Sequence, residues 1–192
     1  MTATMTRIEA YGARWILRNL AATSLLMATA SASPAMAQES RFMIESAAFA
    51  QGGTIPRAHT CTGADTSPPM SWKGVPASAK AIAMVVDDPD APSGTWVHWV
   101  IFDVPADLTR LDEGVPKTAD LPSRARQGVN DFGRLGYNGP CPPPGPPHHY
   151  HFRMFALDSR LDLPANATAA QLEAAIKGHV VATGELVGTF GR

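Results

Sequence analysis

The positions of proline limit the fold of this chain more than any other feature of its sequence. Many of its 17 prolines are concentrated in two segments, 64–80 (ADTSPPMSWKGVPASAK) and 137–147 (YNGPCPPPGPP). Proline has no backbone N–H and cannot donate to the hydrogen-bond ladder of a sheet. We therefore expect both segments to form long, ordered loops or strand edges.

Short runs with a strand-like composition lie around these loops. They are rich in β-branched, aromatic and methionine residues, and clusters of Gly, Pro, Asp and Ser separate them. The expected strands are 41–49, 80–88, 95–105, 150–158 and 184–192. Because there is little helical periodicity between them, the sequence predicts a mainly β fold, an antiparallel two-sheet β-sandwich with one or two peripheral helices.

One segment, 167–182, has a helical pattern. Thr168 is suited to the N-cap, and Gln171 three residues later completes a capping box. The stripe that follows at helical spacing consists of Leu172, Ala175, Ile176 and His179 or Val180. The sequence therefore predicts a helix that continues through this stripe.

The length and charge of the chain set further limits. Its 192 residues, 45% of them hydrophobic, suffice for one domain with a substantial core. Sixteen Lys and Arg residues balance 17 Asp and Glu residues, which gives a formal net charge of −1. This balance provides no overall attraction to nucleic acid or to an anionic membrane, so we expect no nucleic-acid partner.

Residues 1–37 have the three parts of a secretory signal peptide. Basic residues come first, a short apolar run follows at 20–32, and small residues stand at Ala35 and Ala37. The apolar run is too short to cross about 30 Å of hydrocarbon. We therefore expect a signal peptide that is cleaved after residue 37, a folded domain at 38–192, and a periplasmic or secreted product without a stable membrane anchor.

The two cysteines, Cys61 and Cys141, both lie in loop-like sequence. An even number of cysteines in an exported protein favours a disulfide. Closing a loop of about 80 residues stabilises a fold by roughly 4 to 5 kcal/mol in the chain-entropy model. The alternative is a nucleophilic Cys141 with His148 as its base, but a free thiol would have to survive in an oxidising compartment.

Alternation of side chains along two predicted strands gives the histidines two environments. On the strand at 95–105, the expected faces are Trp96, His98, Val100 and Phe102 on one side, and Val97, Trp99 and Ile101 on the other. In the segment HHYHFRMF, they are His148, Tyr150 and Phe152 against His149, His151 and Arg153. His98 is thus expected among large apolar groups.

A small polar patch is expected where these strands meet a proline-constrained loop. Asp88 and Asp90 end one strand, and a carboxylate near an imidazole fixes the tautomer of the ring. His98, His148 and Tyr150 would add N–H and O–H donors. Backbone amides at two loop glycines, Gly139 and Gly145, could also approach a ligand. Such a pocket suits a small anion.

Other functions could use the same residues. Asp88, Asp90, His98 and His148 include suitable zinc donors, and His149 and His151 have the spacing of two ligands on one strand face, but no closed tetrahedral set can be identified. A hydrolase could use them as well, yet there is no G-x-S-x-G motif and no evident nucleophile.

We expect neither a resident metal or cofactor nor an enzyme. An inhibitor acting through its loops is a third alternative, and the sequence specifies no protein partner.

The same stretches resemble a known family. DPDAPSGTWVHWVIFDVP and GPCPPPGPPHHYHFRMFALD resemble the two signature blocks of the phosphatidylethanolamine-binding protein family, in its bacterial Raf-kinase-inhibitor-like branch. Further stretches similar to that branch are TCTGADTSPPMSW, DFGRLGYNGP and GHVVATGELVGTFGR. The resemblance therefore covers nearly all of the chain after the expected signal peptide.

This resemblance implies a β-sandwich with a small anion pocket that takes phosphate, acetate or a phosphoethanolamine head group. The ligand-binding residues it implies are Asp88, Asp90, His98, His148 and Tyr150, with Gly139, Pro140 and Pro142 lining the opening. The sequence departs from eukaryotic members at two positions, where Val97 and His149 replace a His and an Arg. No C-terminal helix is expected after the last strand.

Overall fold

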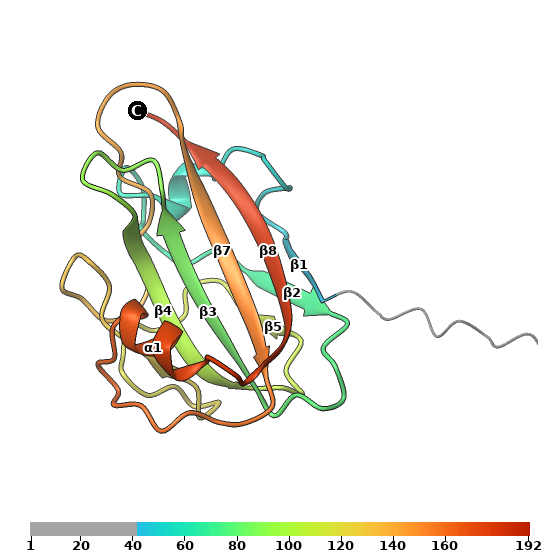
Figure 1. Cartoon of the computed structure of the whole chain (residues 1–192). Coiled ribbons are helices and arrows are strands. Elements are labelled where there is room, and N and C mark those ends of the chain that lie inside the picture. Colours follow the sequence, from blue (N-terminus) through green and yellow to red (C-terminus); the bar gives the residue numbers. More distant parts are fainter. Residues whose placement is uncertain (1–41) are drawn as a thin grey trace, which may run out of the picture. The chain divides into compact units, whose positions relative to one another are not determined.

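The computed structural model describes residues 42–192, so the expected signal peptide at 1–37 lies outside the described residues. Two antiparallel sheets form the fold (Figure 1). The small sheet consists, in spatial order, of β1 (Met43–Ser46), β2 (Met70–Lys73) and β5 (Arg110–Leu111). The large sheet consists of β6 (Arg126–Gln127), β4 (Trp96–Pro105), β3 (Ala81–Asp88), β7 (His148–Leu157) and β8 (Val180–Phe190). The predicted mainly β, two-sheet sandwich is confirmed.

The large sheet is covered on both faces. All eight residues of its central strand β3 are buried, which explains the continuous apolar run AIAMVV. Residues such as Met84 and Val86 pack toward the small sheet, whereas Ala83 and Val85 pack in a second cluster that includes Leu172 of α1. α1 (Ala169–Ala175) lies in front of β4 and β3 in Figure 1. A one-turn 3-10 helix, η1 (Arg57–His59), completes the elements.

The helix at the predicted position is confirmed, but it is shorter than expected. Thr168 and Gln171 form the capping box that the sequence indicates. The helix nevertheless ends at its C-cap Ile176, because Gly178 adopts a positive φ of 82° that turns the chain into β8. The apolar stripe therefore does not continue to Val180, which is an exposed residue of β8.

The two proline-rich segments differ. Segment 137–147 contains no strand, as predicted. Segment 64–80 was expected to be loop throughout, but β2 occupies its centre and pairs with both neighbours in the small sheet. The prolines of that segment flank β2 and leave its N–H groups free to pair, which is why the expectation of a continuous loop is wrong.

A β-bulge shifts the register between β3 and β4. Val86 faces Trp99, but the next residue, Asp87, faces Val97. His98 is therefore an additional residue in β4, opposite no residue of its own in β3. Bulges of this kind redirect a side chain and are frequent near functional sites.

Because of the bulge, the predicted alternation on β4 is wrong beyond His98. His98 packs edge-to-face on Tyr150, with ring centroids 5.2 Å apart, on the side of the sheet that faces the small sheet. Trp99 lies on that same side, whereas Val100 and Phe102 belong to the cluster on the opposite face. His98 thus shares a face with Trp99 and not with Val100.

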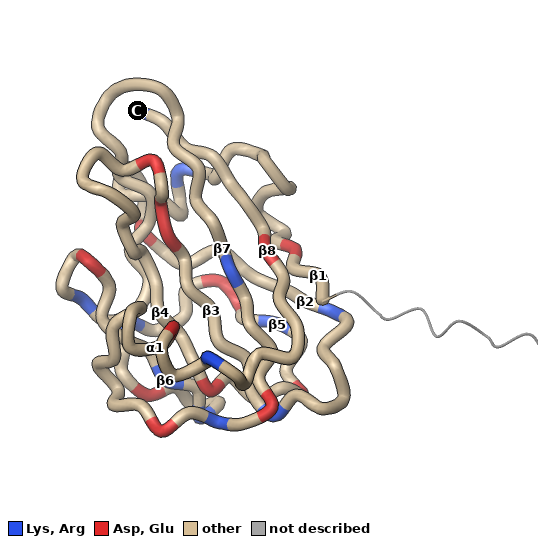
Figure 2. Tube along the Cα trace, viewed as in Figure 1, with Lys and Arg blue, Asp and Glu red and all other residues tan. Residues whose placement is uncertain are grey.

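Lys and Arg positions are interspersed with Asp and Glu positions along the described part of the chain (Figure 2). This agrees with the balanced composition of the chain. Within residues 42–192, no helix has the length and apolar character needed to cross a membrane.

Candidate functional site

A cavity of about 280 Å³ opens at one end of the large sheet, the upper end in Figure 1. Because β3 is antiparallel to both β4 and β7, the last residue of β3 and the first residues of its neighbours meet there. The polar lining includes Asp88, His98 and His148. The apolar lining consists of Ala91, Pro92, Trp96, Phe132, Pro142 and Pro143.

Asp88 and His148 form a nearly buried pair. His148 Nδ1 lies 2.8 Å from Asp88 Oδ2, and the two side chains are 12% and 5% exposed. The other oxygen, Asp88 Oδ1, accepts the backbone N–H of Asp90 at 2.9 Å, which holds the carboxylate in place. Because the carboxylate accepts the Nδ1 proton, Nε2 of His148 is an acceptor in the neutral ring and a donor in the cation.

His98 is held by a different acceptor. Its Nδ1–H donates to the carbonyl oxygen of Asn138 at 2.7 Å, and the residue is only 2% exposed. Burial lowers the pKa of His98, while the Asn138 carbonyl and the charge of Asp88 oppose that shift. The neutral ring therefore predominates, with Nδ1 protonated and Nε2 carrying a lone pair.

Tyr150 lies behind the two histidines and is fully buried. Within residues 42–192 its Oη makes no hydrogen bond of good geometry, although the Asp88 carboxylate lies close enough to act as a weak acceptor. Burial raises the pKa of Tyr150, and the nearby carboxylates of Asp88 and Asp90 raise it further, so the phenol keeps its proton. A buried hydroxyl without a well-aligned partner is costly in a folded protein, so its position beside Asp88 calls for an explanation.

The proline-rich wall of the cavity is held by contacts from distant parts of the chain. Between 140 and 147, only Cys141 and Gly145 have a backbone N–H. A disulfide joins Cys141 to Cys61, as predicted, so Cys141 is not a free nucleophile. Arg192 Nε donates to the carbonyl oxygen of Pro142 at 2.5 Å, and Gly145 N–H donates to the carbonyl oxygen of Arg192 at 3.3 Å.

The loop glycines do not offer their amides to the cavity, contrary to expectation. Gly139 N–H donates to Asp65 Oδ1 at 2.6 Å, and the N–H of Gly145 is used by the C-terminal residue. Gly139 lines a neighbouring crevice, and a Cβ at this position would lie 2.2 Å from the carbonyl oxygen of His59. The glycine is thus required for close packing of two loops. Pro140 is also buried in this packing and does not line the cavity.

Asp90 is placed outside the cavity. Its Oδ2 accepts both the backbone N–H of His149, at 2.9 Å, and Nδ1 of the same residue, at 2.7 Å. These hydrogen bonds lower the pKa of Asp90. The structure therefore brings together Asp88, His98, His148 and Pro142 of the predicted set, with Tyr150 behind them.

The outward histidines of β7 are engaged separately. His149 pairs with Asp90, and His151 Nδ1 lies 2.8 Å from Glu185 Oε1. In the part of the chain that the structure describes, no group of three or more His, Cys, Asp or Glu residues could hold a metal ion.

Several residues that shape the cavity were not singled out from the sequence. Asp65, Asn130, Phe132 and Arg192 act through tertiary contacts that have no local signature. One signal was available: DFGRLGYNGP places an aromatic residue, Phe132, in a short polar and glycine-rich segment, where no core position is expected.

A two-sheet sandwich with a cavity at one end of its large sheet, lined by Asp88, His98 and His148, defines the class of domain to be compared with known proteins. Residues 45–191 match the family described as phosphatidylethanolamine-binding protein. A UPF0098 protein of Methanothermobacter thermautotrophicus is 50% identical over 145 residues, which cover 76% of this chain and 95% of that protein. The chain belongs to the phosphatidylethanolamine-binding protein family.

Solved structures agree with this assignment. A phosphatidylethanolamine-binding protein homologue of Chlamydia trachomatis is 37% identical with a TM-score of 0.73, and the match covers 80% of this chain and 99% of that one. E. coli YbcL, described as a new member of the mammalian phosphatidylethanolamine-binding protein family, is 34% identical with a TM-score of 0.74. The match covers 79% of this chain and 99% of YbcL.

Proposed function

We propose that the protein binds a small anionic ligand, a phosphate or a phosphate-bearing group, in the cavity lined by Asp88, His98 and His148. The observation that carries this proposal is that Asp88, His98 and His148, from three different strands, line one cavity, with the buried Tyr150 packed against His98 behind it. The pairing of each histidine through Nδ1 also leaves Nε2 of both rings available to the cavity.

The charge of the ligand must be compensated within the site. Asp88 is negative, so an anion is favoured when His148 is protonated and donates through Nε2 while Nδ1 remains on Asp88. His98 can become a second donor if the ligand charge favours its cation. Binding is therefore linked to proton uptake, and affinity is expected to rise as the pH falls through the histidine range.

Calorimetric titration with inorganic phosphate between about pH 5 and pH 8 tests the proposal. We expect tighter binding at the acidic end, and a loss of about ten-fold or more in His148→Gln, the cost of one charge-assisted hydrogen bond. His149→Gln is the matched control, because it changes the adjacent ring that faces away from the cavity. Phosphate binding of equal strength in both variants, or no dependence on pH, would contradict the proposal.

We infer that the domain binds its ligand without catalysing a reaction on it, and without a resident cofactor. Two residues with a hydroxyl or thiol group line the cavity, Ser93 and Cys141. Cys141 is in a disulfide, and within residues 42–192 Ser93 has no hydrogen bond to a histidine. Neither residue is thus activated as a nucleophile. Incubation with p-nitrophenyl phosphate should release no p-nitrophenol above the rate of a His148→Gln control.

We also propose that the protein is exported to the periplasm or secreted. The signal-like composition of residues 1–37 and the Cys61–Cys141 disulfide support this location. Fractionation of producing cells followed by intact mass measurement should find an oxidised chain beginning at residue 38. An unprocessed chain in the cytoplasm would contradict it.

A further inference from the structure

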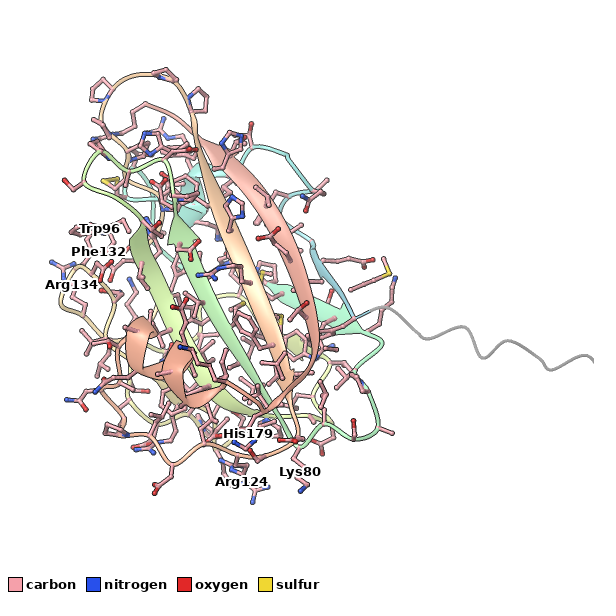
Figure 3. All side chains as sticks on the ribbon, in the orientation of Figure 1. Lys80, Trp96, Arg124, Phe132, Arg134 and His179 are labelled. Carbon is pink, nitrogen blue, oxygen red and sulfur yellow. A yellow bond between two sulfur atoms is a disulfide. The ribbon has the colours of Figure 1, made fainter. Side chains whose placement is uncertain are left out.

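Phe132 is an exposed aromatic residue at the mouth of the cavity, and it is 37% exposed. Its ring meets Trp96 edge-to-face, with centroids 5.5 Å apart and planes at 81°, and meets His98 at 5.3 Å and 65°. Figure 3 shows Trp96 and Phe132 together at one side of β4. A single exposed apolar residue is ordinary, so the way in which Phe132 is held decides its meaning.

The turn that carries Phe132 is fixed by the buried side chain of Asn130, which is 3% exposed. Asn130 Oδ1 accepts the backbone N–H groups of Phe132 at 3.0 Å and Arg134 at 3.2 Å. Its Nδ2 lies 2.9 Å from the carbonyl oxygen of Gly136 and 3.2 Å from that of His98. One buried amide thus joins the Phe132 turn to the strand that carries His98.

The neighbouring residue fastens the same turn to β4 a second time. Asp131 Oδ2 accepts the N–H of Val97 at 2.7 Å, and Asp131 N–H donates to the Val97 carbonyl oxygen at 3.0 Å. Loops that contribute little to a core are usually mobile. This one is held rigidly, and the side chain that it presents at the cavity mouth is Phe132.

The cavity also has more room than an oxyanion needs. Its volume is about 280 Å³, whereas a water molecule occupies about 30 Å³ in the liquid and a phosphate group a small multiple of that. Beyond Asp88, His98 and His148, most of the lining is apolar and includes the rings of Trp96, Phe132, Pro92, Pro142 and Pro143. This volume can hold a phosphate group and one compact ring, but it is too small for two acyl chains.

We propose that Trp96 and Phe132 form an aromatic subsite that selects a phosphate monoester carrying a compact ring over inorganic phosphate. This inference rests on the proposed anion site, which would hold the phosphate. Phe132 is the specificity-determining residue, because edge-to-face contacts with an aromatic ring add to simple apolar burial. Asn130 is a positioning residue that acts through Phe132.

Calorimetry with inorganic phosphate, phenyl phosphate and phosphoethanolamine at one pH tests the subsite. We expect phenyl phosphate to bind about three- to ten-fold more tightly than inorganic phosphate to the unaltered protein. This ratio, normalised to inorganic phosphate in each variant, should fall toward one in Phe132→Ala and be retained in Phe132→Tyr. Met43→Ala is the matched control, since Met43 is a similarly exposed apolar residue on β1, and it should preserve the ratio.

The outcomes separate the two proposals. If inorganic phosphate does not bind, the proposed function fails. If phosphate binds but phenyl phosphate has no advantage, or Phe132→Ala keeps that advantage, only the aromatic subsite is overturned. The subsite is also overturned if phosphoethanolamine binds as tightly as phenyl phosphate and keeps this affinity in Phe132→Ala. The protein would then recognise the ammonium group of the ligand, and not an aromatic ring.

Discussion

The two faces of β7 carry histidine–carboxylate pairs of nearly the same geometry in different surroundings. The pairs are His148–Asp88, His149–Asp90 and His151–Glu185, with N···O distances of 2.8, 2.7 and 2.8 Å. The side chains of the first pair are 12% and 5% exposed, and those of the other two range from 29% to 56%. Only the first pair lines the cavity.

Distance alone therefore does not distinguish a site from a surface contact. Exposed pairs are screened by water and contribute little free energy, whereas a nearly buried pair interacts in a lower dielectric. The inward face also has Tyr150 and His98 beside the pair, whereas the His149 and His151 pairs on the outward face are partly exposed to solvent. Burial and neighbouring groups, rather than the pairing itself, distinguish His148 and Asp88 as the candidate binding residues.

Asp88→Ala should have the largest effect on this comparison. The substitution leaves the Nδ1–H of His148 and the N–H of Asp90 without their acceptor, and we expect a loss of about 2 kcal/mol in the free energy of unfolding. Asp90→Ala, on the exposed side, should cost less than about 1 kcal/mol. Urea denaturation at neutral pH measures both, and equal losses would contradict the distinction between the faces.

The pH dependence of stability should come partly from the inward row. Burial lowers the pKa of His98 in the folded protein. Below about pH 6.5, His98 therefore binds a proton in the unfolded chain but remains neutral in the folded chain. Stability is full above that value and decreases as the pH falls toward the folded pKa of His98. Urea denaturation from pH 8 to pH 5 should show this loss, and His98→Gln should reduce it. An unchanged slope in the variant would show that His98 is not responsible.

The sequence predicted what depends on local pattern. Strands β1, β3, β4, β7 and β8, the capping box at Thr168 and the two faces of β7 follow from spacing along one segment. The Cys61–Cys141 pairing was expected from the even number of cysteines and the predicted export. Asp88, His98 and His148 were grouped correctly because strand ends at one sheet edge bring them together.

The remainder depends on registration between distant segments. The bulge at His98 arises because Val86 pairs with Trp99 while the next residue, Asp87, pairs with Val97. No pattern within β4 alone predicts this change of register. Asp90 was expected in the cavity because it adjoins Asp88, yet the turn directs its carboxylate toward His149. Asn130, a loop residue in sequence, becomes buried only when the 130–138 segment folds onto β4.

The smallest expected effect is on the exposed histidine–carboxylate pairs of the outward face of β7, His149–Asp90 and His151–Glu185. It tests directly whether the two faces differ. A double-mutant cycle on His151 and Glu185, with each replaced by Ala, should give a coupling free energy below about 1 kcal/mol, because both groups are partly solvated and salt screens them. Raising the ionic strength should reduce it further. The same cycle on His148 and Asp88 should give a larger coupling that is less sensitive to salt, since the pair is shielded from solvent. If the two cycles agree in size and in salt dependence, burial does not separate the two faces of β7, and the inward row has no electrostatic advantage for holding an anion.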